Sequence, residues 1–254
     1  MSRSLVSTTE SWDESASALL KIAFEGPTTT LNKLNTFSPF TTATAILDTG
    51  CGVAQVLGSL LGTYGTSLPA DTCLVATDLS PGMVSIVDGR RATEISAGNT
   101  TWGRVETAVW DAQNLAAADA PDDIFSHVTA GLVFFMVERP QDVLAENRRV
   151  LCDGGLFGMT SFRSAGWMDL IEEALDAVKP GSRLSPIPTA WSSTESIARQ
   201  LEDAGFHNVT ADEVKVYYEF EDPEAITRFN WLTERFPNGE GMLEGIAIVA
   251  TGTK

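Results

Sequence analysis

Histidine and cysteine are scarce in this chain of 254 residues. Its two histidines, His127 and His207, are far apart in the sequence, which argues against a histidine-based metal site. Its three cysteines, Cys51, Cys73 and Cys152, are an odd, widely spaced set without the spacing of a metal-ligand motif. We therefore expect no bound metal, and we expect reduced thiols as in a cytoplasmic protein.

Basic residues are also few, with 17 Lys and Arg against 34 Asp and Glu, so the formal net charge is −17. Binding to nucleic acid or to an anionic membrane surface needs a basic face, so neither is an expected partner. No apolar run approaches the roughly 18–20 residues that cross a bilayer. Residues 1–13 lack the basic-then-apolar order of a secretory signal, which again predicts a cytoplasmic location.

The most informative stretch is 45–54, in a chain that is 43% hydrophobic and long enough for one domain with a buried core. An apolar run leads to Asp48, which is followed by Gly50, Gly52 and a helical pattern from Gln55 to Leu61. Strand, tight turn and helix in this order are typical of a nucleotide-type site at the carboxyl end of a parallel strand. The glycines permit positive φ and close approach of backbone to a ligand, although a lone Gly-x-Gly is weak by itself.

Two more predicted strands lead into carboxylates. Asp78 closes the strand at 72–79, about 26 residues after the glycine turn, and Asp111 follows the strand at 104–109. An acidic residue roughly 20 residues after such a turn binds ribose hydroxyls in dinucleotide sites. The alternative is that Asp78 is a surface turn residue.

Strand-like and helix-like segments alternate along the whole chain, which predicts an α/β fold with a parallel-type, doubly wound sheet and helices on both faces. A loop is expected at 62–71, and the fourth strand is expected to be the most central. Besides the strands already named, we expect strands at 124–129, 156–162, 209–220 and 242–252. Helices are expected at 10–36, 55–61, 140–151, 166–178, 194–204 and 223–236, and another is expected to begin at Ser80 and Pro81. We expect Pro27 to break the first of them, and the glycines of 152–155 to end the helix at 140–151.

The ordered motifs resemble those of class I S-adenosylmethionine-dependent methyltransferases, and most closely the small-molecule, ubiquinone-biosynthesis-like group. They are Ile46–Gly52, Asp78, Asp111-Ala112, Arg149–Leu151 with Gly154-Gly155, and the segment Leu201–Phe206. The resemblance implies one Rossmann-like domain over residues 1–254, with a mostly parallel seven-stranded sheet whose last strand is antiparallel. It also implies an N-terminal helical cap at 1–40, a cofactor-binding core at 41–165, and a substrate lid with C-terminal strands at 166–254.

The same resemblance implies S-adenosylmethionine as cofactor and S-adenosylhomocysteine as product. Asp48 would hold the methionine part, Asp78 the ribose hydroxyls and Asp111 the adenine amino group. The full set of implied cofactor-binding residues is Asp48, Gly50, Cys51, Gly52, Asp78, Leu79, Met83, Asp111, Ala112, Gln113, Thr129 and Ala130. A nicotinamide-dependent dehydrogenase is disfavoured because position 55 is Gln, so Gly-x-Gly-x-x-Gly is absent.

The chain departs from the family pattern at two places. Ala54 stands where the third glycine of Gly-x-Gly-x-Gly is usual, which is a mild departure. Phe135 and Met136 stand where many relatives have one or two histidines, so the usual candidate for a general base is missing. We therefore expect transfer to an O, N or S atom, less readily carbon, that is already electron-rich or is deprotonated by a residue of the lid, with the reaction driven mainly by positioning. The catalytic residue is unknown, and the weak candidates are His127, Arg163 and Glu138.

Aromatic residues cluster after the strands and in the C-terminal third, which favours a small aromatic or hydrophobic metabolite as substrate, as in secondary metabolism. Core packing is the alternative explanation for many of them. The candidate substrate-binding residues are Trp12, Phe24, Phe134, Phe135, Phe162, Trp167, Trp191 and Trp231. A cyclisation, pericyclic step or elimination without net methyl transfer is the competing activity, and a non-catalytic binding protein is the third alternative. A monomer or homodimer is expected.

Overall fold

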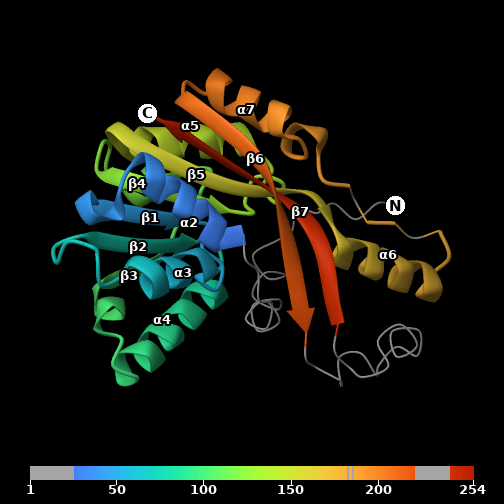
Figure 1. Cartoon of the computed structure of the whole chain (residues 1–254), viewed down its shortest axis with the longest axis horizontal. Helices are drawn as coiled ribbons and strands as arrows, with labels where there is room; N and C mark the ends of the chain where they lie inside the picture. Colours follow the sequence, from blue (N-terminus) through green and yellow to red (C-terminus); the bar gives the residue numbers. More distant parts are fainter. Residues whose placement is uncertain (1–25, 182, 185, 221–240) are drawn as a thin grey trace.

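Seven strands form one sheet in a computed structural model that describes residues 26–181, 183–184, 186–220 and 241–254 (Figure 1). The strands lie in the order β3-β2-β1-β4-β5-β7-β6, so β4 is central, as predicted. Their bounds are β1 Ala45–Thr49, β2 Cys73–Asp78, β3 Val105–Val109, β4 Phe125–Gly131, β5 Leu151–Ala165, β6 His207–Phe220 and β7 Gly241–Thr253.

The direction of the strands determines where a site can form. The strands β1 to β5 pair in parallel, whereas β7 runs antiparallel between β5 and β6. The predicted α/β class, the seven strands and the antiparallel last strand are thus confirmed. Because parallel strands share one carboxyl edge, the segments that follow β1, β2, β3 and β4 meet at that edge.

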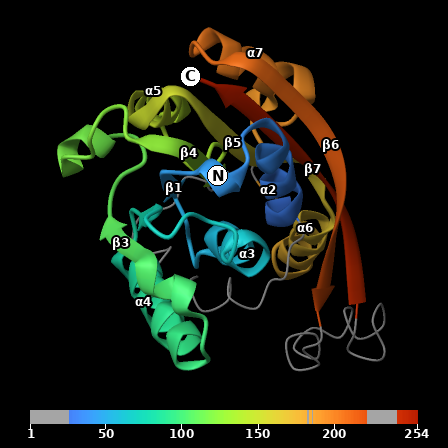
Figure 2. The ribbon, with the colours of Figure 1, turned by 60° about the vertical axis from the view of Figure 1, so that its left-hand side comes forward.

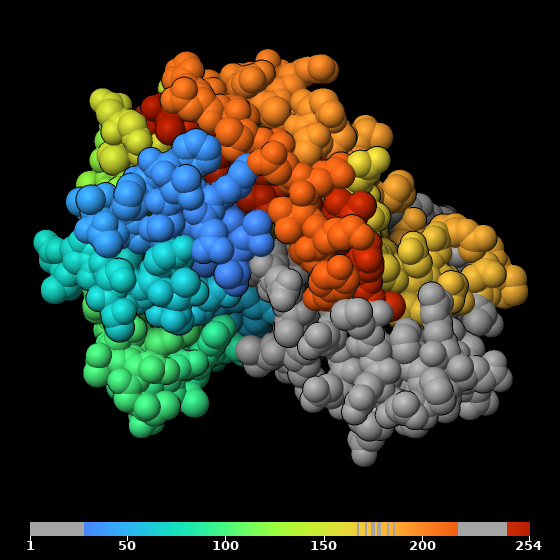
Figure 3. Space-filling view, in the orientation of Figure 1, coloured from blue at the N-terminus to red at the C-terminus, as the bar shows by residue number. Residues whose placement is uncertain are grey.

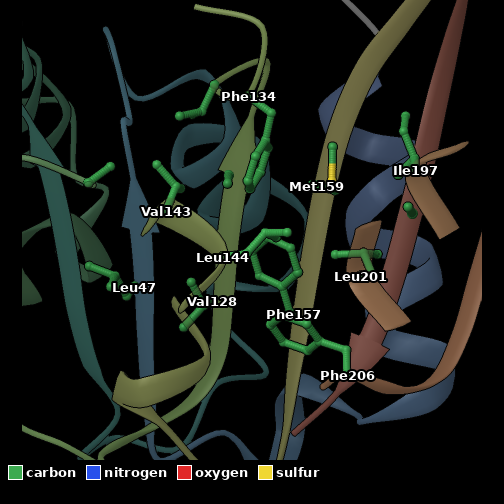
Figure 4. Packing of buried hydrophobic residues seen from close by; sticks show 14 of the residues in the cluster. Leu47, Val128, Phe134, Val143, Leu144, Phe157, Met159, Ile197, Leu201 and Phe206 are labelled. Atoms are coloured by element: carbon green, nitrogen blue, oxygen red, sulfur yellow. The ribbon is translucent and has the colours of Figure 1, made fainter. Parts of the chain in front are cut away.

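Helices cover both faces of the sheet (Figures 1 and 2). One hydrophobic cluster joins α2 and α3 to one face through Leu34, Leu57 and Leu74. A second cluster joins α5 and α7 to the other face, where Figure 4 shows Phe157 stacked on Phe206. The helices of the described residues are α2 Gly26–Phe37, α3 Gln55–Tyr64, α4 Pro81–Ser96, α5 Pro140–Val150, α6 Gly166–Val178 and α7 Thr194–Asp203.

Two local predictions were wrong, and the predicted break at Pro27 stays a prediction. Pro27 lies in the first turn of α2, where a missing N–H is tolerated, and the residues before Gly26 lie outside the described ones. The expected loop at 62–71 begins later, because α3 continues to Tyr64. Residues 152–155 do not end α5 but form an irregular part of β5, in which Gly154 has φ +73°. The predicted helices at 10–25 and 223–236 lie outside the described residues.

The helix α2 lies beside β6, as the blue and orange surfaces in Figure 3 show. Lys33 Nζ donates to Thr210 Oγ1 at 3.1 Å and forms an ion pair with Asp212, so two segments about 180 residues apart are joined. No helix among the described residues is long and apolar enough to cross a membrane.

Candidate functional site

The glycine turn between β1 and α3 has the backbone that the sequence predicts. Gly50 and Gly52 have φ of +61° and +53°, and Ala54 also adopts the left-handed conformation with φ 59°. A Cβ at Gly50 would lie 2.7 Å from Cγ2 of Val133, so the turn packs closely against the segment after β4. Among the described residues, a Cβ at Gly52 would meet nothing within 4 Å, so this part of the chain leaves the space over the turn open.

Asp48 is the last residue but one of β1, and its side chain is buried beneath the turn. Thr129 Oγ1 of β4 donates to Asp48 Oδ1 at 2.7 Å, and the Leu57 N–H of α3 donates to Oδ2 at 3.2 Å. The pKa of Asp48 is raised to about 7 as the net result of several effects. Burial raises it most, the two hydrogen bonds lower it, and the charge of Asp78 adds a smaller rise. A positively charged ligand near Asp48 would favour its ionised form.

Asp78 joins the glycine turn to the next helix. Its Oδ2 accepts from the Gly52 N–H and its Oδ1 from the Ser80 N–H, both at 2.9 Å. Ser80 in turn is the N-cap of α4, since its Oγ accepts from the Met83 N–H at 3.0 Å, as predicted. Asp78 is thus oriented by two backbone donors at the carboxyl end of β2.

The loop that carries Asp111 lies next to Asp78. The Trp110 N–H donates to the Asp78 carbonyl at 3.0 Å, which continues the β2–β3 pairing into the loop. Asp111 Oδ1 accepts from the backbone N–H of Gln113 at 2.9 Å. Gln113 Oε1 in turn accepts from the Arg139 N–H at 2.8 Å, so the loops after β3 and β4 are joined.

The structure therefore brings together the predicted cofactor residues from four strand ends. Thr129 and Ala130 are buried at the end of β4, and Met83 is buried against Val53 of the turn. Leu79 is 41% exposed, which is unusual for a large apolar side chain. Ala112 is buried in the loop after β3. Within the turn, burial raises the pKa of the Cys51 thiol well above its usual value, so the thiol stays protonated.

The three weak catalytic candidates lie in different surroundings. His127 is fully buried, more than the half-burial that the strand pattern suggests. Its Nε2 donates to the Ser38 carbonyl at 3.0 Å, and burial lowers the pKa of its imidazole. Arg163 is exposed and forms an ion pair with Glu213, and Glu138 is exposed in the segment after β4.

The aromatic candidates are only partly described. Phe134 stacks on Trp191, with ring centroids 4.7 Å apart, and both rings are buried in the core cluster that includes Ile197 and Leu201 of α7. Figure 4 shows Phe134 within this cluster. Phe135 and Phe162 are also buried, with centroids 6.2 Å apart. Trp12, Phe24 and Trp231 lie outside the described residues, as does the side chain of Trp167. Substrate contact stays a prediction for the whole set.

Several residues of this site were missed by the sequence analysis. Leu57, Arg90 and Val133 contact the carboxylates or the turn, but none carries a recognisable motif signal. A narrow crevice with no room for a water molecule also lies between α2, α3, the end of β4 and the middle of β5, and its lining includes the hydroxyl-bearing residues Thr30 and Thr160. Among the described residues, no group of three or more side chains has a metal-binding arrangement.

Comparisons with known proteins agree with this geometry. The sequence profile of a family described as a methyltransferase domain matches residues 47–159. Methyltransferase ucsB from Acremonium sp is 30% identical over 213 residues, which cover 83% of this chain and 73% of the relative.

Solved structures share the fold at lower identity. A SAM dependent methyltransferase from Aquifex aeolicus is 16% identical with a TM-score of 0.53, and the match covers 95% of this chain and 98% of that chain. The [4+2]-cyclase SpnF is 18% identical with a TM-score of 0.53, over 89% of this chain and 80% of that chain. With the glycine turn, the sheet order and a relative that matches most of both chains, the chain belongs to the class I S-adenosylmethionine-dependent methyltransferases.

Proposed function

We propose that this protein binds S-adenosylmethionine at the carboxyl edge of β1–β4 and transfers its methyl group to a small metabolite. The observation that carries the proposal is the placement of Asp48, Asp78 and Asp111 at the carboxyl ends of three adjacent strands, beside a space over Gly52 that the described residues leave open. These groups match the three parts of the cofactor. A carboxylate under the turn suits the cationic amino acid, a second suits two ribose hydroxyls, and a third suits the adenine amino group.

The residues present fit the cofactor. A Cβ at Gly52 would project into space that the described residues leave open, so glycine keeps this space clear for a ligand. The Gly52 and Ser80 N–H groups orient Asp78 at the carboxyl end of β2, and a carboxylate suits two adjacent ribose hydroxyls because it can accept from both. The net charge of −17 does not oppose a cationic sulfonium.

When bound, S-adenosylmethionine would supply a methyl group whose carbon is activated by the positively charged sulfur and is open to in-line attack by an electron-rich atom, with the neutral thioether as leaving group. The chain's contribution is to hold and orient the partners, since Phe135 and Met136 offer no imidazole beside the site. His127 is buried and bonded to Ser38, so it is poorly placed to remove a proton. We infer an acceptor that needs no strong base, such as an amine, a thiolate or an acidic phenol.

The substrate class that fits best is a small aromatic or hydrophobic metabolite, as in secondary metabolism. The buried pair Phe135 and Phe162 lies after β4 and within β5, next to the proposed cofactor edge, and supports this choice. The likeness to the [4+2]-cyclase SpnF supports a second candidate, in which the same fold catalyses a cyclisation without consuming the cofactor. Fold alone does not choose between these chemistries.

Calorimetric titration with S-adenosylmethionine and S-adenosylhomocysteine tests the proposal. Asp78→Ala removes the carboxylate that accepts from Gly52 and Ser80, and we expect affinity to fall by about tenfold or more, as for a lost charged hydrogen-bond partner. Asp176→Ala is the matched control, because Asp176 also accepts a backbone N–H, from Gly181, but lies at the end of α6. Wild-type protein that binds neither ligand would overturn the proposal.

Turnover distinguishes the two activities. We expect S-adenosylhomocysteine to accumulate when a panel of small phenols, amines and thiols is incubated with enzyme and cofactor. A product formed without loss of S-adenosylmethionine would instead support the cyclase-type activity.

A further inference from the structure

Arg90 lies in the second half of α4, and its guanidinium reaches back to the glycine turn. Its Nη1 donates to the Ala54 carbonyl at 2.9 Å and to the Val53 carbonyl at 3.2 Å. The guanidinium also lies over the buried Trp102 ring, with Cζ 4.9 Å from the ring centroid. Two carbonyls and one ring face together hold this cation in one position.

The two carbonyls belong to the peptide planes on either side of Ala54. The Val53 carbonyl is in the plane that precedes Ala54, and the Ala54 carbonyl is in the plane that follows it. The relative orientation of these planes is set by φ and ψ of Ala54, which are 59° and 46°. A side chain with a Cβ disfavours this left-handed conformation, and such residues persist only where their surroundings enforce it.

The neighbouring helix leaves room for this arrangement. A Cβ at Gly58 of α3 would lie 2.3 Å from Arg90 Nη2, and its three nearest neighbours all belong to the guanidinium. Glycine is a poor helix former compared with alanine, so its presence inside α3 is explained by the approach of Arg90.

We propose that Arg90 is a positioning residue that holds Ala54 in the left-handed conformation and so sets the glycine turn for the cofactor. This inference rests on the proposed function, because the turn matters for catalysis only if S-adenosylmethionine binds there. A glycine at this position would need no such support, since glycine adopts positive φ without penalty. Arg90 therefore offsets the strain of Ala54 in the left-handed conformation.

The test is a double-mutant cycle read out by affinity for S-adenosylmethionine and S-adenosylhomocysteine. We expect Arg90→Met to weaken binding by about tenfold, or about 1.4 kcal/mol. Ala54→Gly in the Arg90→Met background should restore affinity to within about twofold of Ala54→Gly alone, because the turn no longer needs the clamp. Gly58→Ala should also weaken binding, because the added Cβ displaces the guanidinium of Arg90. Alanine is a better helix former than glycine, so a weaker helix α3 would not explain this loss of affinity.

Arg104→Met is the matched control. Arg104 Nη2 also donates to two carbonyls, those of Pro69 and Thr72, but in the loop before β2, away from the glycine turn. Its loss should lower stability without changing cofactor affinity.

Unchanged affinity in Arg90→Met, or a loss that Ala54→Gly does not rescue, would overturn the inference. If wild-type protein binds neither ligand, the proposed function fails, and the same cycle is then measured by urea unfolding. Non-additive effects of Arg90→Met and Ala54→Gly on unfolding would still support the clamp, and additive effects would refute it.

Discussion

Asp48 makes the stability of this protein depend on pH in an unusual direction. Its carboxyl is buried and has a folded-state pKa of about 7, against an ordinary value of 3.8 in the unfolded chain. Between these values the unfolded chain releases the proton and the folded chain keeps it. The folded state therefore loses stability as pH rises from about 4 to about 7, which is opposite to the behaviour of a salt-bridged carboxylate.

The size of this effect follows from the two pKa values. Each pKa unit corresponds to about 1.4 kcal/mol, so the rise at Asp48 destabilises the folded state by about 4 kcal/mol above pH 7. Asp48→Asn carries a neutral amide at every pH and lacks this penalty. In the wild type, Thr129 and the Leu57 N–H donate hydrogen bonds to the carboxylate. If the amide accepts these bonds less well, the loss of stability is the same at every pH, because the amide does not titrate.

Urea unfolding of wild type and Asp48→Asn at a series of pH values from 4.5 to 8.5 measures this difference. Groups away from Asp48 titrate alike in both proteins, so the difference in unfolding free energy reports on Asp48 together with its coupling to Asp78 and Cys51. We expect the variant to gain about 3 kcal/mol relative to wild type between pH 4.5 and 8.5, with most of the change complete by about pH 7, because about 1 kcal/mol of the penalty is already present at pH 4.5. A difference that stays constant with pH would refute the assignment of a raised pKa.

Two further predictions concern the core. Asn147 is fully buried in α5, and among the described residues neither its Nδ2 nor its Oδ1 has a hydrogen-bond partner, so Asn147→Leu should raise the unfolding free energy by about 1–2 kcal/mol. A lower urea midpoint for this variant would show that the amide is satisfied. Phe134→Ala should cost about 3–5 kcal/mol in urea unfolding, because the ring packs on Trp191 and Phe157. A loss below about 1 kcal/mol would indicate that Phe134 is not a core residue.

Much of the core sheet could be predicted from local patterns. Buried strands are short and uniformly apolar, so β1 and β2 were found within one or two residues. The full order of the strands was not predicted: only the central place of the fourth strand was expected, and the antiparallel last strand came from the family resemblance. The end of α5 was misjudged because tertiary pairing decides it: Leu151 and Leu156 both pair with β4, so residues 152–155 lie between them as an irregular stretch of β5.

In the candidate site too, residues with a local sequence signal were predicted, and residues brought in by tertiary packing were not. The carboxylates Asp48 and Asp78 were predicted because each closes a strand, and the parallel sheet brings such ends together. Their partners were not predicted, because the Leu57 N–H and the guanidinium of Arg90 reach the site only through the packing of α3 and α4. The full burial of His127 likewise depends on the Ser38 carbonyl, which lies 89 residues earlier in the chain.

The hydrogen bonds of the site connect the carboxylates and the turn into one unit. Asp78 accepts from Gly52 of the turn, and Asp48 accepts from the first turns of α3, which the glycine turn starts. Arg90 holds the last peptides of the same turn. A cofactor that contacts any one of these groups therefore meets a backbone already held by the others, so less conformational freedom is lost on binding. This arrangement suits the proposed reaction, which depends on positioning: when no strong base activates the acceptor, it reacts only if the methyl group is held in line with it.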